Sequence, residues 1–332
     1  MRLQLNVGQS TELLHVVKGA FVPKNALASG TTAQSASLDA TAVMLLMLIC
    51  FLLAGGQVAI KIANDGLSPI LQAGLRSLGA AALLGAFAVA RGVRLFGCDG
   101  ILWSALLAGL LFAAEFALLY PGLQRTTAAH GVILLYTSPF VVAVGAHVLI
   151  PGERLTRFKL AGLLLAFAGV ATVTLGRDAS AVAHHARPTL EGDLLCLAAA
   201  VAWGLLTLVI RASRLAKLPT ERVTFLLLAI SAPVLLGLSL ALGETGVTSL
   251  APKILGAFAF TVVFVGFVSF TTTNWLLTRY PATKVMAFLL LTPVFGVLAG
   301  HLILGETLAP SLLAGLALVL TGLWLVNRPA PA

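Results

Sequence analysis

Ten apolar runs make up most of this chain, and they restrict its possible folds more than any other feature. Each run is about 20 residues long, the length at which an α-helix crosses a hydrocarbon core about 30 Å thick. We therefore predict an all-α integral membrane protein with ten transmembrane helices. The runs lie near Thr41–Ile60, Pro69–Ala90, Ile101–Tyr120, Ala128–Ile150, Leu160–Gly176, Leu194–Ile210, Val223–Leu242, Ile254–Leu277, Val285–Leu304 and Ala309–Val326.

The composition supports this prediction, because only 10% of the 332 residues are charged, whereas a soluble domain carries roughly 25%. The formal net charge of +9 is compatible with nucleic-acid binding, but the sequence has no compact basic stretch with interleaved aromatic residues. A positive excess is also typical of the cytoplasmic loops of membrane proteins. We expect a lipid bilayer around the protein and no nucleic acid as a partner.

Recognised catalytic and cofactor motifs are missing from the sequence. It has no Gly-x-Ser-x-Gly elbow, no His-Glu-x-x-His helix and no P-loop. Its three cysteines are an odd number without close spacing, which gives neither a disulfide framework nor a metal site. We therefore expect no enzymatic activity, no cofactor and no metal.

The lysines and arginines predict the orientation, because basic residues tend to remain on the cytoplasmic side. With the N-terminus inside, 15 of the 21 fall on cytoplasmic segments, five on outer segments, among them Lys61, and Arg76 alone falls within a span. We predict that both termini are cytoplasmic. Residues 1–40 hold no apolar core of a removable signal peptide, and we expect them to form a disordered cytoplasmic tail.

The second half of the chain repeats the first. We predict two five-helix repeats, residues 41–176 and 190–327. Because five is odd, the second repeat enters the membrane from the opposite side, an arrangement that places the substrate site of transporters near the bilayer midplane. The matched pairs include, at an offset of 154 residues, Arg125 with Arg279, Pro139 with Pro293 and His147 with His301, and, at an offset of 153, Glu153 with Glu306, Gly162 with Gly315 and Gly169 with Gly322.

Residues 67–84, 122–173 and 276–326 resemble the EamA-type repeats of the drug/metabolite transporter superfamily. A proline at the span centre, a Gly-Glu-x-Leu corner and two glycines seven residues apart occur in both halves. The first half departs from the family pattern, with Gly55-Gly56 where a Trp-Gly is usual, whereas the second half has Trp203-Gly204. The resemblance implies a ten-helix basket with helices 1–4 and 6–9 around a cavity and helices 5 and 10 outside it.

Arg76 and Glu115 are the two charged residues well inside the predicted spans. A charge at a helix centre costs roughly 2.5–3.5 kcal/mol on insertion scales, so both side chains should face the bundle interior. One interpretation is a mutual ion pair that joins the second span to the third. The other is that they line a cavity and bind a charged or zwitterionic substrate, or that Glu115 carries a coupling proton.

A polar stripe follows one face of the eighth predicted span. At the offset of 154, its Ser269 corresponds to Glu115 and its Asn274 to Tyr120, so two equivalent helices each present aromatic and hydrogen-bonding groups. This composition fits a small-molecule cavity, or else hydrogen bonds between helices, which contribute about 0.6 kcal/mol each. At α-helical spacing the stripe consists of Gly266, Ser269, Phe270, Thr273 and Asn274.

Pro139 and Pro293 stand about halfway along the fourth and ninth predicted spans. Each lacks a backbone donor and is expected to bend its helix, which predicts a hinge in each half. Tyr136 lies near the freed backbone of the first hinge and is a candidate substrate ligand.

The corners after these spans carry glutamates, and the following helices carry glycines. Glu153 and Glu306 are expected to interact with the dipole of the helix that follows each of them. The two glycines of each repeat lie one heptad apart on one face, which predicts close helix packing.

These features predict a secondary transporter of a bacterial inner membrane that moves a small polar or amphipathic metabolite, such as an amino acid or its derivative, more often outward than inward. One alternative is an importer or exchanger of a nucleotide-sugar-like or phosphorylated solute, and another is a non-transporting membrane enzyme or receptor subunit. Proton coupling and a homodimer are compatible with the sequence. The candidate substrate-binding residues are Arg76, Glu115, Tyr120, Tyr136, Ser269, Thr273 and Asn274.

Overall fold

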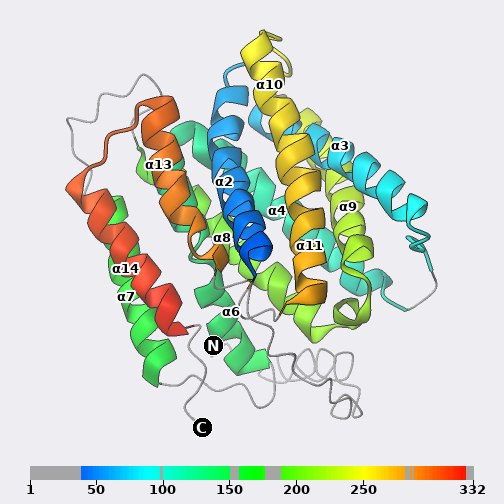
Figure 1. The fold of residues 1–332 in the computed structure, drawn as a ribbon. Helices are drawn as coiled ribbons and strands as arrows, with labels where there is room; N and C mark the ends of the chain where they lie inside the picture. Colours follow the sequence, from blue (N-terminus) through cyan, green and yellow to red (C-terminus); the bar gives the residue numbers. More distant parts are fainter. Residues whose placement is uncertain are drawn as a thin grey trace, which may run out of the picture.

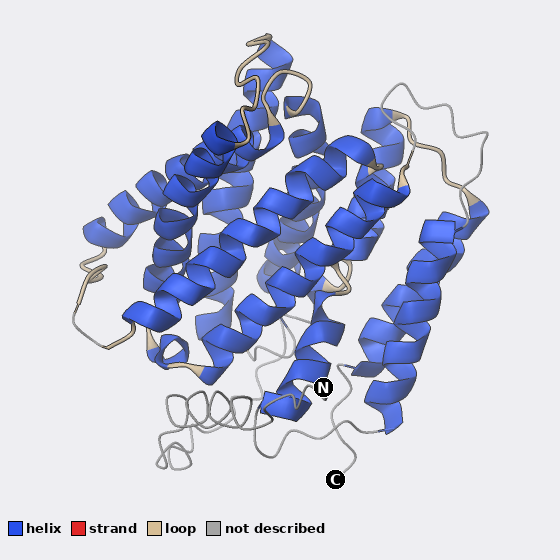
Figure 2. Ribbon diagram, turned by 180° about the vertical axis from the view of Figure 1, so that it is seen from behind, coloured by secondary structure: helices blue, strands red, loops and turns tan. Residues whose placement is uncertain are grey.

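The computed structural model describes residues 39–97, 100–149, 157–175, 188–280, 285 and 288–326, and these ranges contain helices and loops with no β-strand (Figure 2). Six predicted spans are single helices, namely α2 (Ala40–Ala63), α3 (Pro69–Ala90), α4 (Leu102–Arg125), α7 (Arg157–Leu175), α8 (Leu190–Ala212) and α9 (Thr220–Ala241). The last two described helices are α13 (Thr292–Leu304) and α14 (Pro310–Val326). A short 3₁₀ turn, Arg214–Lys217, lies between α8 and α9.

Three spans differ from the single helices that the sequence predicts. The ninth is interrupted by a turn at Leu290 and Leu291, directly before α13. The fourth is broken into α5 (Ala128–Leu135) and α6 (Ser138–Leu149). The eighth runs from α10 (Pro252–Phe260) through a π-helix, Thr261–Ser269, into α11 (Phe270–Arg279). Counting the fourth and the eighth as one span each, eight helices are long and apolar enough to cross a membrane, and α13 and α14 are shorter apolar helices.

The breaks lie directly before the two prolines. The fourth span breaks at Tyr136 and Thr137, and Pro139 lies in the first turn of α6 rather than in the middle of a helix. Pro293 likewise lies in the first turn of α13. Backbone N–H groups in the first turn have no partner inside the helix, so a proline there costs the following helix no hydrogen bond. The Thr137 hydroxyl donates to the Leu134 carbonyl at 2.6 Å, which satisfies one acceptor at the break.

Polar residues begin the helices where the chain re-enters the bundle. Asp39 accepts from the backbone N–H of Ala42 at 2.7 Å and caps α2. Thr127 and Thr189 cap α5 and α8 in the same way. These caps satisfy backbone donors that have no partner inside the helix. We call the end of the bundle where α2 begins the Asp39 end, and the opposite end, where α8 begins, the Asp193 end; the Asp39 end is lower in Figure 1.

The outer faces of the helices are apolar. The exposed fractions of Trp103, Phe167 and Leu164 are 79%, 76% and 64%. In a soluble protein these large apolar side chains would be in contact with water. Large apolar side chains on the outside of a helical bundle are stable only against another apolar medium. The fold is that of a multi-pass membrane protein.

The two halves contact one another in matched pairs. Helix α4 packs against α8, and α10 packs against α2. Helix α6 packs against α8, and α13 packs against α2. In each of these two pairs of contacts, exchanging the halves of the chain turns the first contact into the second. The contacts of α3 with α9 and of α7 with α14 join equivalent helices of the two halves.

Helices α7 and α14 form one flank of the bundle (Figure 1). A Cβ atom on Gly162 would lie 2.6 Å from the carbonyl oxygen of Gly322, and one on Gly169 would lie 2.9 Å from that of Gly315. Only glycine allows backbones to approach this closely. The close packing predicted from the two glycine pairs is confirmed.

Candidate functional site

Two helices that pack together, α3 and α4, carry a group of buried polar side chains. Gln72, Arg76 and Ser77 come from α3, and Glu115 and Tyr120 come from α4. All five are buried, with exposed fractions between 0% and 6%. Each has a side-chain atom that finds no hydrogen-bond partner among the residues that the structure describes. Buried polar groups are normally paired, so this concentration indicates a place where a ligand or water supplies the partners.

Arg76 connects the cluster to the second half of the chain. Its Nε donates to the carbonyl of Thr261, at the start of the π-helix, at 3.4 Å. The guanidinium carbon lies 4.6 Å from the centre of the Phe116 ring, within the range of a cation–π contact. Its Nη1 is buried and finds no partner in the described part of the chain. One donor of the guanidinium is therefore open.

Glu115 faces the same space from α4. Arg76 acts on it electrostatically, but within the described ranges no ion pair between the two is closer than the 4.0 Å limit for such contacts. Its Oε2 is buried and has no hydrogen-bond partner among the described groups. The structure thus brings the two charges together without joining them directly. A molecule between them would meet a guanidinium on one side and a carboxyl group on the other.

An aromatic row forms one wall of this cluster. The rings of Phe112 and Phe116 are 4.6 Å apart, and those of Phe116 and Tyr120 are 5.8 Å apart, both edge to face. The Tyr120 hydroxyl is also without a partner among the described residues. Flat apolar surface with a few polar atoms is the usual lining of a small-molecule site.

Tyr136 lies in a different part of the bundle. It is in the apolar cluster around α5, α7 and α14, and its ring is 5.8 Å from that of Trp203. Its hydroxyl lies close to Thr292. The structure therefore groups Tyr136 with the breaks in the fourth and ninth spans and not with Arg76 and Glu115.

The candidate residues of the eighth span are distributed around the π-helix. The Ser269 hydroxyl donates to the Phe264 carbonyl of its own helix at 2.9 Å, and Thr273 is partly exposed. Asn274 belongs to α11, but its side chain lies outside the described part of the structure. The α-helical spacing used to place these residues on one face does not hold across Thr261–Ser269, because a π turn contains more residues.

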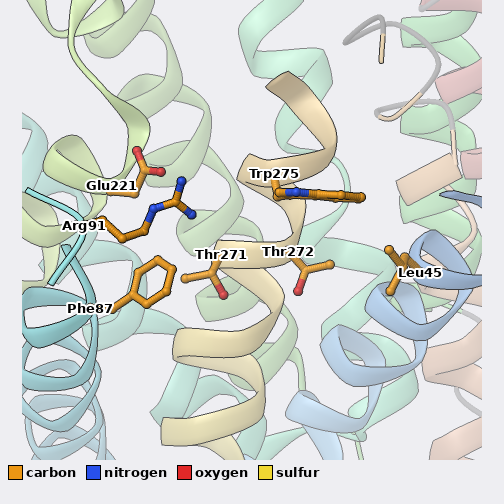
Figure 3. A pocket seen from close by; sticks show the side chains of 7 residues that line it. All are labelled: Leu45, Phe87, Arg91, Glu221, Thr271, Thr272 and Trp275. Atoms are coloured by element: carbon orange, nitrogen blue, oxygen red, sulfur yellow. The ribbon is translucent and has the colours of Figure 1, made fainter. Parts of the chain in front are cut away.

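A cavity of about 330 Å³ opens at the Asp39 end (Figure 3). It lies where α2 and α9 begin and where α3 and α11 end. Figure 3 shows the Arg91 guanidinium and the Glu221 carboxylate extending toward one another beside Phe87. From α11, the cavity is lined by Thr271, Thr272 and Trp275, and from α2 by Leu45. Its volume suits a small metabolite.

The sequence did not identify this cavity, because Arg91 and Glu221 follow or begin a helix. Charged residues at such positions usually face water. Arg91, which caps the end of α3, is about four helical turns beyond Arg76, a distance of about 22 Å along the axis. In both places an arginine of α3 or its C-cap lies near an acidic residue of another helix, Glu115 of α4 or Glu221 of α9.

Membrane-spanning helices that enclose unpaired polar groups, with a cavity at one end, are the features of a membrane carrier. The comparison with known proteins narrows this class. The chain belongs to the EamA-like transporter family, which it matches over residues 40–175 and 190–328.

Individual relatives share about three residues in ten. A probable amino-acid metabolite efflux pump of Salmonella typhimurium is 29% identical, over 81% of this chain and 88% of the relative. An uncharacterized transporter of Bacillus subtilis is 30% identical, over 80% and 84%. A WAT1-related chloroplastic protein of Arabidopsis thaliana is 30% identical over 82% of this chain, which spans 66% of that protein's length. A crystal structure with 24% identity matches 87% of this chain and 96% of its own, with a TM-score of 0.60, and shows the shared fold.

Proposed function

We propose that this protein is a secondary transporter that exports a small zwitterionic or amphipathic metabolite, such as an amino acid or its derivative, across a bacterial inner membrane. One observation carries the proposal: Arg76 and Glu115 are buried near one another, each with an open hydrogen-bonding atom, and the described residues show no direct ion pair between them. The carboxylate of an amino acid pairs with a guanidinium, and its ammonium group pairs with a carboxylate. The aromatic row from Phe112 to Tyr120 suits an apolar side chain.

The comparisons support the class of substrate and the direction. The relative from Salmonella typhimurium is named as an amino-acid metabolite efflux pump. In our proposal the Asp39 end faces the cytoplasm, since the basic residues concentrate there. The cavity at that end is then the entrance from the cytoplasm, and the buried cluster is the binding site deeper in the bundle.

A phosphorylated or nucleotide-sugar-like solute is the second candidate, and the charges of the buried cluster favour the first. A phosphate group carries about −1.5 to −2 charges near neutral pH. The buried cluster offers one cation, Arg76, and places the Glu115 carboxylate beside it. Two like charges in a low-dielectric site repel strongly. The named relatives are transporters, which leaves a membrane enzyme or receptor subunit without a supporting observation.

The test is transport by the purified protein in liposomes. Vesicles are loaded with a mixture of amino acids, and the metabolites that leave are measured by mass spectrometry with and without a pH gradient. We expect at least one amino acid or derivative to leave faster than from protein-free liposomes loaded with the same mixture. Movement of phosphorylated solutes alone, from a second loaded mixture, would favour the alternative.

In the same assay, the variant Glu115→Gln tests whether Glu115 belongs to the substrate-binding site. Hydrogen bonds to charged groups contribute about 1.5–3 kcal/mol, so we expect the transport rate to fall about tenfold or more at low substrate concentration. Glu191→Gln is the matched control, because Glu191 is an exposed glutamate that pairs with Arg125 at the surface. A Glu115→Gln protein with the normal rate and normal yield would remove this residue from the site.

A further inference from the structure

His130 and Asp193 form a buried contact between the two halves at the Asp193 end. Nδ1 of His130 lies 3.1 Å from a carboxylate oxygen of Asp193. The same oxygen accepts a hydrogen bond from the Thr126 hydroxyl at 2.6 Å. His130 and Thr126 belong to the corner between α4 and α5 in the first repeat, and Asp193 belongs to the first turn of α8 in the second. The contact therefore holds this corner against α8.

Two more charged residues lie at the same corner. Lys61, in the last turn of α2, donates to the backbone carbonyls of Leu123, at 3.2 Å, and of Thr126. Glu306, which follows α13, accepts from the first two backbone N–H groups of α5 at 2.6 and 3.0 Å. Lys61 and Glu306 also act on one another electrostatically. We call the following residues the Asp193 cluster: Lys61, Thr126, His130, Asp193 and Glu306.

The formal charges of the Asp193 cluster do not cancel. Asp193 and Glu306 carry one negative charge each, and Lys61 carries one positive charge. The sum is −1 while the His130 imidazole is neutral, and one proton on the imidazole brings it to zero. All four side chains are buried, none more than 8% exposed. Because an uncompensated charge away from water is strongly unfavourable, the cluster favours the uptake of one proton.

Other titratable groups around α5 leave this balance unchanged. Helix α14 has no charged residue, and those of α7 lie in its first turn, at the Asp39 end. His301, in the last turn of α13, is exposed, and its Nδ1 lies 2.8 Å from the backbone oxygen of Glu306. The buried Cys196 thiol lies near Asp193 and is uncharged near neutral pH. Two solvent-exposed pairs of opposite charge lie close by, Arg125 with Glu191 at 3.4 Å and Asp65 with Lys253 at 3.9 Å.

A proton from solution reaches the pair at His130. The His130 side chain is 10% exposed, whereas that of Asp193 is fully covered. Imidazole is also the side chain that gains its charge between about pH 5 and 8. A neutral ring that faces a carboxylate donates to it from Nδ1 and accepts the new proton at Nε2. One N–H bond forms and none is broken, and the ring becomes an imidazolium.

We propose that His130 and Asp193 form a proton-binding site, and that a proton bound there holds the α4–α5 corner against α8. The bound proton turns a hydrogen bond into a charge-assisted ion pair and removes the net charge of the Asp193 cluster. The consequence for transport rests on the proposed function, in which the substrate leaves at the Asp193 end. The cluster covers that end, so acid there slows export.

The first test measures stability and needs no substrate. The melting temperature of the purified protein in detergent is measured at about pH 5.5 and at about pH 7.5, for the wild type and for His130→Gln, which keeps a donor but takes no charge. An ion pair made only in the folded protein stabilises it while the imidazole is protonated, and this stabilisation is lost as the pH rises. We expect the deficit of His130→Gln relative to the wild type to be larger at the acidic pH by about 2–4 °C.

Two further variants separate the charge from the hydrogen bond. Asp193→Asn keeps an acceptor for the Thr126 hydroxyl and removes the negative charge, so its deficit should also be larger at the acidic pH. His301→Gln is the matched control, because His301 is an exposed histidine at the same end. Its deficit should be the same at both pH values. Monodisperse elution of each variant confirms folding, and Asp193→Asn decides the test if His130→Gln does not fold.

The second test measures export from liposomes loaded with the amino-acid mixture, with the same pH on both sides. We expect the wild type to export about fivefold more slowly at about pH 5.5 than at about pH 7.5. His130→Gln should lose most of this difference, and His301→Gln should retain it. A His130→Gln profile that matches the wild type would overturn the role of the site in export.

The two tests fail separately. Equal deficits at both pH values in folded His130→Gln and Asp193→Asn would overturn the proton-binding site. If no amino acid leaves the liposomes, the proposed function fails, whereas the melting temperatures still decide whether His130 and Asp193 bind a proton.

Discussion

Glu306 shows how one carboxylate stabilises a helix that is remote in the sequence. We expected it to interact with α14, the helix that follows it, and that expectation was wrong. Its two oxygens instead accept from Ala128 and Ala129, at the first turn of α5 in the other half. Backbone N–H groups at a helix start lack partners and carry a partial positive charge, so a buried carboxylate there satisfies both.

Replacing this carboxylate should destabilise the fold. Hydrogen bonds to charged groups contribute about 1.5–3 kcal/mol, and we expect Glu306→Ala to lower the free energy of unfolding by about that amount. Glu306→Gln keeps one acceptor and should lose about half as much. The apparent melting temperature in detergent, measured by size-exclusion chromatography, tests this order. Equal melting temperatures for the two variants and the wild type would contradict the capping role.

The limits of sequence reasoning are clear at this scale. Because a charge facing lipid is unfavourable, we predicted that Arg76 and Glu115 face the bundle interior, and both are buried in the structure. Lys61 was expected just beyond the first span, whereas it lies buried in the last turn of α2. Its partners are carbonyls more than 60 residues away, and no local pattern reveals such a contact.

At the scale of elements, the flank formed by α7 and α14 depends on missing side chains. Alanine at position 322 would place its Cβ 2.6 Å from the carbonyl oxygen of Gly162. We expect Gly322→Ala to force the helices apart and lower the melting temperature. Gly237→Ala in α9 is the control, because its Cβ would meet nothing within 4 Å, and alanine is the better helix former by about 1 kcal/mol. Similar melting temperatures for the two variants would show that the flank tolerates separation.

The type and order of the elements could be predicted, but their irregular parts could not. Runs of apolar residues define where helices cross a membrane, and paired glycines define where helices touch. Apolar runs carry no information on whether a segment such as Thr261–Ser269 adopts α or π geometry, because both satisfy the backbone internally. Whether this segment is an α-helix or a π-helix decides which residues of α11 face the cavity, here Thr271, Thr272 and Trp275.

At the scale of the whole molecule, the two breaks are the places where the halves can change shape. Pro139 and Pro293 each follow a break and stand at equivalent positions of the repeat. We expect Pro139→Ala and Pro293→Ala to permit a continuous helix, which slows turnover about tenfold while leaving the equilibrium binding of substrate unchanged. Pro69→Ala at the start of α3 is the control. Wild-type turnover in both variants would remove the hinge role.

The reciprocal glycine contacts have a consequence for how such a fold arises. Exchanging the halves at the offset of 153 turns the contact of Gly162 with Gly322 into that of Gly315 with Gly169, so one contact occurs twice. An interface with this property is isologous. A single repeat therefore carries both sides of it, and two identical five-helix chains could dimerise through it before any gene fusion joined them.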